Sequence, residues 1–494
     1  MKTCVKNKLN LKTDFYLEII KRSIDARSRT PRIQLKIKVF IDETPPGLNI
    51  YIPQYPSVKN KKHVAIAGTG PAGLFAALKL IERGIKPVLF ERGKNIRDRR
   101  RDLAAINKEG IVNPESNYCF GEGGAGTYSD GKLYTRSTKR GDVKKILESF
   151  VGFGAGKEIL IDAHPHIGTN KLPAIIEKIR ETILNAGGEV RFNSKITNID
   201  ISFAQVNAVE INHNEKFDTS HLILATGHSA HDIFEILHGK KILIEAKPFA
   251  LGIRIEHPQQ LIDEMQYHCK NRGEFLPPAS YSIVKNVDGR GVFSFCMCPG
   301  GIIAPCATAN DEIVTNGWSP SKRNNPFANS GFVVSVELKD LVNYQKFGPL
   351  AGMYFQKEIE HNCFLAGGGD QTAPAQRMGD FVNYIVSSTL PDCSYQPGIK
   401  SIRLDTVLPE FIYLHLREAF LMIQRSGSPY FANEAVIVAP ESRTSSPVKI
   451  PRNNETMEHP QIKGLFPCGE GAGYAGGIIS AAMDGIKSAE FVAA

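Results

Sequence analysis

Residues 63–73 read HVAIAGTGPAG, so a glycine-rich turn comes directly after a short apolar segment. The turn matches the pattern G-x-G-x-x-G, and LFAALKLIERG at 74–84 follows it with the apolar spacing of a helix. A second apolar segment, KPVLF at 86–90, completes the order strand, turn, helix, strand. This order predicts a βαβ unit with parallel strands and a right-handed crossover, the beginning of a Rossmann-type α/β domain.

The residue types in the turn are those that a bound dinucleotide requires. Gly68 permits the tight turn, Gly70 lets the backbone approach a pyrophosphate, and Gly73 lets helix and strand pack closely. The backbone around Pro71 and Ala72 begins the helix, and the unpaired N–H groups at this positive end stabilise a diphosphate. The turn therefore predicts a dinucleotide site.

An acidic residue, Glu91, ends the second strand of the unit and is placed to accept hydrogen bonds from ribose hydroxyls. A 2′-phosphate beside this carboxylate would be repelled, so the site favours FAD or NAD over NADP.

Three further glycine-rich segments decide between FAD and NAD. They read FGEGGAGTYSDGKL at 120–133, HLILATGH at 221–228 and CGEGAGYAGGIISAAMDG at 468–485. The first offers small residues to a second stretch of cofactor, and the second ends an apolar strand. The third opens a helix whose amino terminus suits the negative charge of a reduced flavin. An NAD dehydrogenase does not need this last loop, so the predicted cofactor is FAD.

The chain of 494 residues is long enough for two or three domains. A small α/β unit and linker are predicted over 1–58, with a helix over 14–27 and a strand over 33–41. The FAD-binding domain is predicted in two parts, 59–234 and 436–494. An α+β substrate or cap domain is predicted as an insertion over 235–435, where the strand–helix alternation is lost.

Composition indicates a globular protein, with a net charge of +9 and nine scattered cysteines. An odd, dispersed set of thiols is typical of a reducing compartment, and no signal peptide or membrane span is expected, so a cytoplasmic location is predicted. The basic cluster Arg97, Arg99, Arg100 and Arg101 fits a solvated helix face better than a phosphate or nucleic-acid contact. Nucleic-acid binding is thus not expected, and the oligomeric state stays open.

Longer motifs resemble one family. They read NYCFGEGGAGTYSDGKL, PHIGTNKL, FCMCPGG, PAQRMGDF, RTSSPVKI and GEGAGYAGGIISAAMDG. The chain from about His63 onward resembles the bacterial FAD-dependent dehydrogenases, often labelled NAD(P)/FAD-dependent oxidoreductases, which have a glutathione-reductase-type FAD-binding fold. The resemblance implies FAD at the first glycine turn, at Glu91 and Arg92, and at Ile196 or Lys195 for the adenine. It also implies contacts at Gly123, Gly124, Ala125, Gly126, Thr226, Gly227, Gly469, Glu470, Gly476, Gly477 and Ile478.

Flavin performs the electron transfer itself, so few catalytic side chains are expected. Cys296 and Cys298 are candidates for thiol redox chemistry, although both also fit a buried strand as small apolar residues. Arg377 and Arg443 could anchor an anionic substrate or form structural ion pairs. No metal site is expected, because no second ligand pair has matching spacing.

These features predict an FAD-dependent oxidoreductase that passes hydride or electrons through a non-covalently bound flavin to an unidentified small molecule. Gly367–Gly369 does not open a helix, so a dedicated NAD(P) domain is not expected, and NADH or NADPH would dock only transiently. Two alternatives remain open. One is a flavin monooxygenase, and the other is an FAD-dependent RNA-modifying enzyme or FAD-binding partner protein, motivated by the basic stretch 97–101 and the basic amino terminus.

Overall fold

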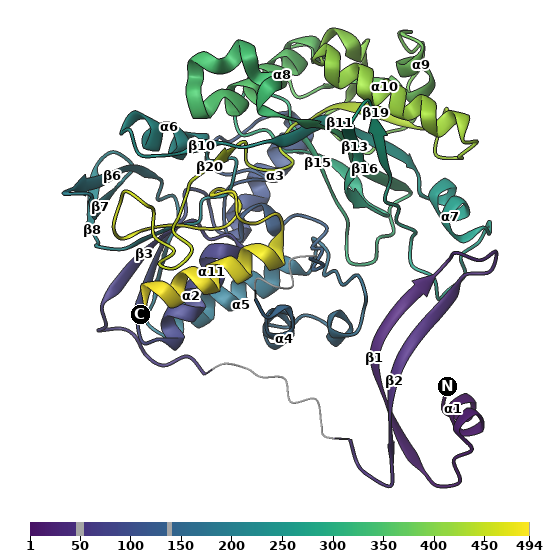
Figure 1. Ribbon diagram of the computed structural model, residues 1–494, viewed down its shortest axis with the longest axis horizontal. Coiled ribbons are helices and arrows are strands. Elements are labelled where there is room, and N and C mark those ends of the chain that lie inside the picture. The colour runs from purple at the N-terminus through teal and green to yellow at the C-terminus, as the bar shows by residue number, and fades with distance from the viewer. Residues whose placement is uncertain (46–53, 136–140, 494) are drawn as a thin grey trace.

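A five-stranded parallel sheet lies at the centre of the first domain in the computed structural model, which describes residues 1–45, 54–135 and 141–493 (Figure 1). Its strands in spatial order are β21 (Leu465–Pro467), β9 (Leu222–Leu224), β3 (His63–Ala67), β4 (Lys86–Phe90) and β5 (Glu189–Arg191). Every neighbouring pair is parallel. The predicted Rossmann-type sheet is therefore confirmed, and its first strands are those named by the sequence.

Three helices cover one face of this sheet, α2 (Pro71–Glu82), α5 (Leu172–Asn185) and α11 (Ile478–Val492) (Figure 1). α2 begins at Gly70 with a proline in its first turn, a position where the missing N–H costs nothing. The carboxy-terminal helix α11 packs along α2, so helices from the first and the last part of the domain's sequence lie side by side on the sheet.

The remaining elements of the first domain surround this sheet. They are α3 (Ile96–Glu109), α4 (Val143–Gly152), α6 (His231–Gly239), and the antiparallel strands β6 (Ile196–Ser202), β7 (Gln205–Ile211) and β8 (Glu215–Asp218). Among the described helices, none has both the length and the apolar composition that a membrane span requires.

The second domain is built on a mixed sheet of seven strands. In spatial order these are β12 (Val284–Val287), β13 (Arg290–Cys298), β16 (Phe327–Val336), β11 (Phe249–Pro258), β19 (Val436–Glu441), β17 (Ala373–Arg377) and β18 (Ile399–Ser401). The helices beside it are α7 (Gln259–Tyr267), α8 (Ala351–Gly367), α9 (Met378–Val382) and α10 (Glu410–Arg425) (Figure 1). Two small ribbons complete it, β10 (Glu245–Ala246) with β20 (Val448–Lys449), and β14 (Ile302–Pro305) with β15 (Thr315–Trp318).

The carboxy-terminal limit of this second domain differs from the predicted one at residue 435. β19 lies between β11 and β17 in the seven-stranded sheet, so it belongs to the second domain. All six of its residues are buried. A strand that is buried on both faces has a continuous apolar sequence in either domain, so the sequence does not indicate which sheet it joins. Strand pairing therefore moves the boundary beyond Glu441.

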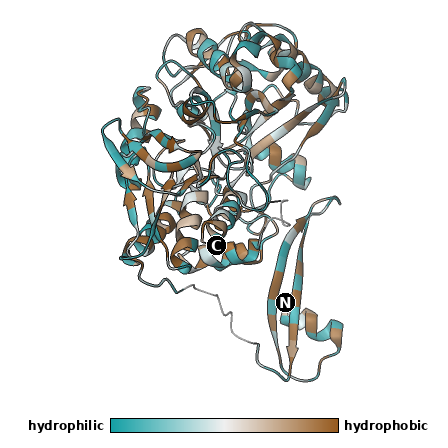
Figure 2. Ribbon diagram, turned by 60° about the vertical axis from the view of Figure 1, so that its left-hand side comes forward, coloured by the Kyte–Doolittle hydropathy of each residue, from teal (hydrophilic) through white to brown (hydrophobic). Residues whose placement is uncertain are grey.

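The amino-terminal segment forms a limb beside the main body (Figures 1 and 2). It contains α1 (Lys2–Leu9) and a hairpin of β1 (Phe15–Asp25) with β2 (Arg32–Ile41). The predicted strand over 33–41 is confirmed, but the predicted helix over 14–27 is wrong. Alternating apolar residues at its start and several isoleucines fit a strand, and pairing with β2 decides the conformation. Part of the predicted linker, residues 46–53, lies outside the described residues.

A buried histidine in β11 makes stability sensitive to acid. His257 has no exposed surface, its Nε2 lies 2.8 Å from the carbonyl oxygen of Tyr430, and its Nδ1 has no hydrogen-bond partner. Burial lowers the pKa of His257 to about 4. Since the unfolded chain takes up this proton near pH 6.5 and the folded chain does not, the contribution to stability is complete above that pH and declines toward pH 4.

We expect wild-type protein to lose roughly 3 kcal/mol more stability than His257→Phe between pH 6.5 and pH 4, because phenylalanine removes this titration. Urea unfolding of both proteins across that range measures the difference. Parallel stability curves for the two proteins would contradict the assignment.

Candidate active site

A cavity of about 440 Å³ lies at the carboxyl ends of the parallel strands, where α/β sheets bind ligands. One side is formed by the ends of β3, β4 and β9 and by the amino termini of α2 and α11. The opposite side is formed by β13, β14 and β15 of the second domain. Most residues of the segment 118–134 line a further part of the cavity.

The glycine turn before α2 faces this cavity. Gly68 has a φ of +96°, and a Cβ there would lie 2.5 Å from the carbonyl oxygen of Ala225. A Cβ on Gly73 would lie 2.0 Å from the carbonyl oxygen of Gly68, so this glycine allows strand and helix to pack. A Cβ on Gly70 meets nothing closer than Gly124 Cα at 3.9 Å. The space beside Gly70 is therefore cavity and not protein.

Most of the residues predicted to bind cofactor line this one cavity, although they come from distant parts of the chain. They are Gly68, Gly70, Pro71, Ala72, Glu91, Arg92, Gly124, Ala125, Gly126, Ile196, Thr226, Gly227, Gly469, Glu470, Gly476, Gly477 and Ile478. Gly73 and Gly123 are outside the lining, and Gly123 instead packs against Thr127 and Ile176. The structure thus brings the four glycine segments together.

A buried arginine, which the sequence reasoning assigned to a solvated face, shapes one of these segments. Arg99 has no exposed surface, and its guanidinium donates hydrogen bonds to four backbone carbonyls, those of Asn117, Tyr118, Glu122 and Gly124, at 2.8–3.0 Å. These bonds fix the loop that lines the cavity. This corrects the interpretation of the basic cluster, of which Arg97, Arg100 and Arg101 remain exposed.

The sequence did contain a signal for this role. The buried residues of α3 are Ile96, Arg99, Leu103 and Ile106, and their spacing places the arginine on the apolar face of the helix. A charged residue on such a face needs buried partners.

The carboxylate of Glu91 also holds loops in place. One oxygen accepts hydrogen bonds from the backbone N–H and the hydroxyl of Thr69, at 3.0 and 2.7 Å. The other accepts from the backbone N–H groups of Gly93 and Gly121, at 2.9 and 3.0 Å. These bonds fill the four acceptor positions of a carboxylate. In this arrangement Glu91 joins three cofactor-facing segments, which corrects the expectation that it is free to accept from a ribose.

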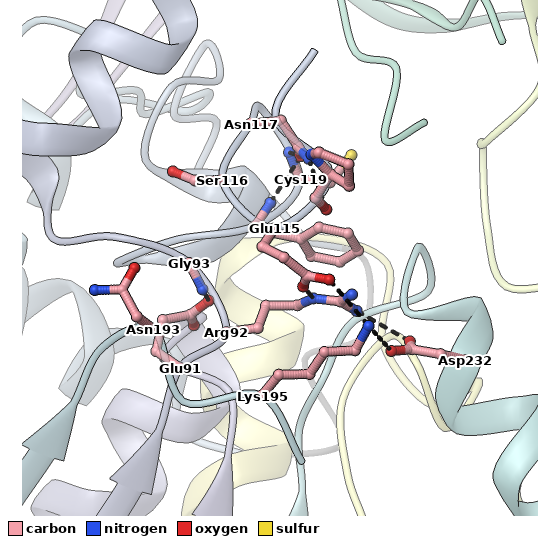
Figure 3. A network of polar contacts seen from close by, with 12 residues as sticks. Glu91, Arg92, Gly93, Glu115, Ser116, Asn117, Cys119, Asn193, Lys195 and Asp232 are labelled. Atoms are coloured by element: carbon pink, nitrogen blue, oxygen red, sulfur yellow. Dashed lines mark hydrogen bonds and ion pairs between the residues drawn. The ribbon is translucent and has the colours of Figure 1, made fainter. Parts of the chain in front are cut away.

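Four charged side chains form a ring at the end of the cavity next to Glu91 (Figure 3). They are those of Arg92, Glu115, Lys195 and Asp232. Arg92 donates to Glu115 and Asp232 at 2.6 and 2.9 Å, and Lys195 binds both carboxylates at 3.0 Å. The Arg92 guanidinium also lies 4.1 Å from the ring centroid of Phe120. Burial acts to raise the pKa of Glu115, but the two cations hold it below its usual value.

The amino terminus of α11 contributes a second positive helix end. Gly476, Gly477 and Ile478 line the cavity there, as the turn before α2 does at the first helix. Glu470 lies nearby, with a carboxylate oxygen 3.3 Å from Nδ1 of His228. Burial acts to raise the pKa of Glu470, and His228 outweighs it so that the pKa is lowered.

The other end of the cavity contains thiols. Cys119, Cys296 and Cys306 line it, whereas Cys298 is fully buried. All nine cysteines of the chain are free. The side chain of Lys132, which the sequence reasoning did not single out, lies 3.9 Å from the sulfur of both Cys296 and Cys298.

The two predicted arginines differ in position. Arg443 lines the cavity, but its guanidinium is bound by Glu360, Glu312 and Thr308 at 2.7–3.0 Å. It is therefore a buried, ion-paired residue of the cavity wall. This agrees with the alternative that Arg443 forms structural ion pairs.

Arg377 does not line the cavity. Its guanidinium donates to the carbonyl oxygens of Thr389 and Asn433 and to the Thr389 hydroxyl, at 2.6–3.0 Å. Of the two alternatives for Arg377, a substrate contact or a structural role, the structure favours the structural role, because neighbouring loops of the second domain already use its donors.

The residues of the cavity fit an FAD molecule. Bare backbone at Gly70 leaves room for a diphosphate, and two helix amino termini offer N–H groups to its charge. Aromatic side chains, among them Phe120, Phe295 and Trp318, line the cavity and suit a flat aromatic ring system.

Known proteins show the same kind of domain. A family model described as FAD-dependent protein, C-terminal domain-like, matches residues 248–444, and a domain of unknown function matches residues 1–40. A Clostridium beijerinckii protein, described as uncharacterized, is 38% identical over 510 residues, which cover 99% of this chain and 95% of that protein.

Among solved structures, CtdE in complex with FAD and a substrate matches 88% of this chain and 80% of its own, at 11% identity and a TM-score of 0.34. The tetracycline destructase Tet(51) matches 60% of this chain and 62% of its own, at 10% identity and a TM-score of 0.29.

Proposed function

Because this chain belongs to the same family as the Clostridium beijerinckii protein and carries the C-terminal domain of FAD-dependent proteins, we propose that it is an FAD-dependent oxidoreductase. Its cofactor is FAD. The observation that carries the proposal is the single cavity that joins four distant glycine segments to a thiol-lined wall. In our proposal the flavin is held non-covalently, in a fold of the glutathione-reductase type, and serves a small-molecule substrate.

The residues on the first domain's side would hold the cofactor. The turn at Gly68–Gly70 and the loop at Gly124 would receive the diphosphate, and Ile196 with the charged ring around Arg92 would close the adenosine end. Bound FAD supplies hydride or electron transfer. The second domain, with β13 and β15 in the cavity wall, would then shield the reacting end from water.

Gly367–Gly369, the segment considered from the sequence as a binding turn for a nicotinamide donor, does not begin a second Rossmann unit. Gly367 ends α8, and Gly368 and Gly369 follow it with positive φ angles, so these glycines close a helix and do not begin one. NADH or NADPH, if it is the donor, would therefore dock transiently at the cavity.

A nucleic-acid-modifying role, motivated by the basic stretch 97–101 and the basic amino terminus, loses part of its support. Arg99 of α3 is buried against the loop from Asn117 to Gly124. This leaves three exposed arginines in the basic cluster of α3. No residue of the cavity favours a monooxygenase over a dehydrogenase or reductase.

We expect purified protein to be yellow, to release one FAD per chain on unfolding, and to be reduced anaerobically by NADH or NADPH. Stopped-flow absorbance of the oxidised flavin, with each donor in turn, measures the rate. Mixing the reduced protein with oxygen tests the alternative, since only a monooxygenase accumulates a hydroperoxyflavin. A colourless protein that cannot be reconstituted with FAD would overturn the proposal.

A further inference from the structure

The thiol pair at the end of β13 lies in an irregular part of its strand. The pairing of β13 with β16 shifts register between Phe295 and Cys298, and Cys296 has a φ of +46°, which is unusual for any residue other than glycine. Such bulges redirect side chains and are frequent beside active sites. Here the bulge places Cys296 in the cavity lining, while Cys298 is buried behind it.

A lysine from the first domain reaches this pair. Lys132 Nζ lies 3.9 Å from the sulfur of both Cys296 and Cys298 and donates a hydrogen bond to the carbonyl oxygen of Met297 between them. Its nearest carboxylate, Asp130, is 3.9 Å away and is itself bound by Arg323 at 2.7 Å. The positive charge of Lys132 is therefore shared by Asp130 and the two sulfur atoms, which all lie 3.9 Å from its nitrogen.

The two thiols differ in acidity. The hydrogen bond from the Cys298 thiol, together with the charges of Lys132 and Arg254, holds the pKa of Cys296 well below the usual range of a thiol. The pKa of Cys298 is raised by the same hydrogen bond and by burial. Burial also raises the pKa of Cys119 and Cys306, which line the same cavity.

We propose that Cys296 is a thiolate nucleophile of the cavity, that Lys132 stabilises its charge, and that Cys298 is the resolving thiol in the reduction of a small-molecule disulfide. The geometry supports this division of roles, since Cys296 lines the cavity, Cys298 is fully buried, and both sulfur atoms lie 3.9 Å from Lys132 Nζ. Completion of a catalytic cycle rests on the proposed oxidoreductase function, but the reactivity of the thiols does not.

Reduction of the substrate disulfide needs no reagent other than the thiols of Cys296 and Cys298. The Cys296 thiolate attacks one sulfur of the disulfide RSSR, so that a Cys296–SR bond forms, the substrate S–S bond breaks, and RS⁻ leaves. Cys298 transfers its proton to this RS⁻, and its sulfur attacks Cys296 and expels the second RS⁻. The products are RSH, RS⁻ and a Cys296–Cys298 disulfide, so two electrons pass from the dithiol to the substrate.

The protein must then recover the dithiol. A disulfide that spans a single residue is strained, and strained disulfides are the easily reduced ones. Two electrons from the proposed flavin cofactor restore both thiols. This places the pair between the flavin and an external disulfide.

The first test is alkylation of the FAD-containing protein by iodoacetamide at a series of pH values, with each cysteine quantified by peptide mass spectrometry. We expect Cys296 to react at neutral pH, and Cys119 and Cys306 to react only in alkaline solution. Lys132→Met should slow the labelling of Cys296 at pH 7 roughly tenfold or more, whereas Lys132→Arg, which keeps the charge, should not.

The second test uses 2,2′-dipyridyl disulfide as the probe. We expect Cys298→Ser to accumulate a pyridyl adduct on Cys296, and wild-type protein to release both halves of the probe and form the internal disulfide. If the variant forms no adduct, or if Cys296 is alkylated with the pH profile of Cys119, the proposal is overturned. Flavin reduction by a nicotinamide donor is measured separately, so loss of one activity with the other intact identifies which proposal fails.

Discussion

Replacing Arg99 with alanine is expected to destabilise the protein and to release its FAD. The guanidinium is the donor for four carbonyl groups, three buried and one partly buried, in the loop from Asn117 to Gly124. Each buried acceptor left without a donor costs about 1–3 kcal/mol, and entering water offsets part of this cost, so we expect a loss of about 3–5 kcal/mol in unfolding free energy. Urea unfolding of the variant and wild-type proteins measures it.

The effect on cofactor binding follows from the same contacts. Without Arg99, the loop that lines the cavity is no longer held in the form that receives FAD, and the affinity falls with the population of that form, on the order of a hundredfold. Fluorescence titration of apoprotein with FAD gives the dissociation constant. Arg101→Ala is the matched control, because its side chain on the same helix is 79% exposed and should tolerate the change. Equal effects of the two substitutions would refute the role given to Arg99.

Replacing Gly70 with valine should abolish FAD binding and leave the fold intact. Gly70 has a φ of −68° and a ψ of −179°, an extended conformation that valine adopts without strain. A Cβ at this position meets no protein atom closer than Gly124 Cα at 3.9 Å, and the valine methyl groups would extend into the place where the diphosphate would lie. We therefore expect the affinity for FAD to fall on the order of a thousandfold, while stability of the apoprotein changes by about 1 kcal/mol or less.

The measurements are the FAD content of the purified variant and the urea unfolding of both apoproteins. Gly239→Val is the matched control, because Gly239 also has open space at its Cβ position but lies at the end of α6, outside the cavity lining. Gly73→Val should instead fail to fold, since its Cβ would lie 2.0 Å from a backbone oxygen. A Gly70→Val protein that keeps a full complement of FAD would show that the diphosphate lies elsewhere.

Two buried arginines, Arg99 behind the loop that lines the cavity and Arg443 in the cavity wall, show why charge alone misleads a reading of sequence. Arg99 and Arg443 occur in polar stretches that suggest exposure, yet both are buried with several partners. Burying a charge is favourable only where acceptors converge on it. For Arg443 these come from Glu312 and Glu360 of the second domain, more than eighty residues away in sequence.

The sequence alone determined the βαβ unit, the cofactor class and the segments that surround the cavity. These are encoded locally, because a turn that brings backbone against a phosphate needs glycine at fixed positions, and strands and helices have fixed apolar periods. The wrongly predicted helix over 14–27 marks the limit of this reasoning, since pairing with β2 decided that segment.

Only the tertiary structure decided the electrostatic partners. Lys132 meets Cys296 and Cys298 across 164 and 166 residues of sequence, and Glu91 meets Gly121 across 30. Such contacts depend on which loops the sheet order and the second domain bring to one cavity, and no local pattern records that. The physical reason is that a charge takes its partners from whatever lies within a few ångströms in the folded chain, whereas backbone conformation follows mainly from its own neighbours in sequence.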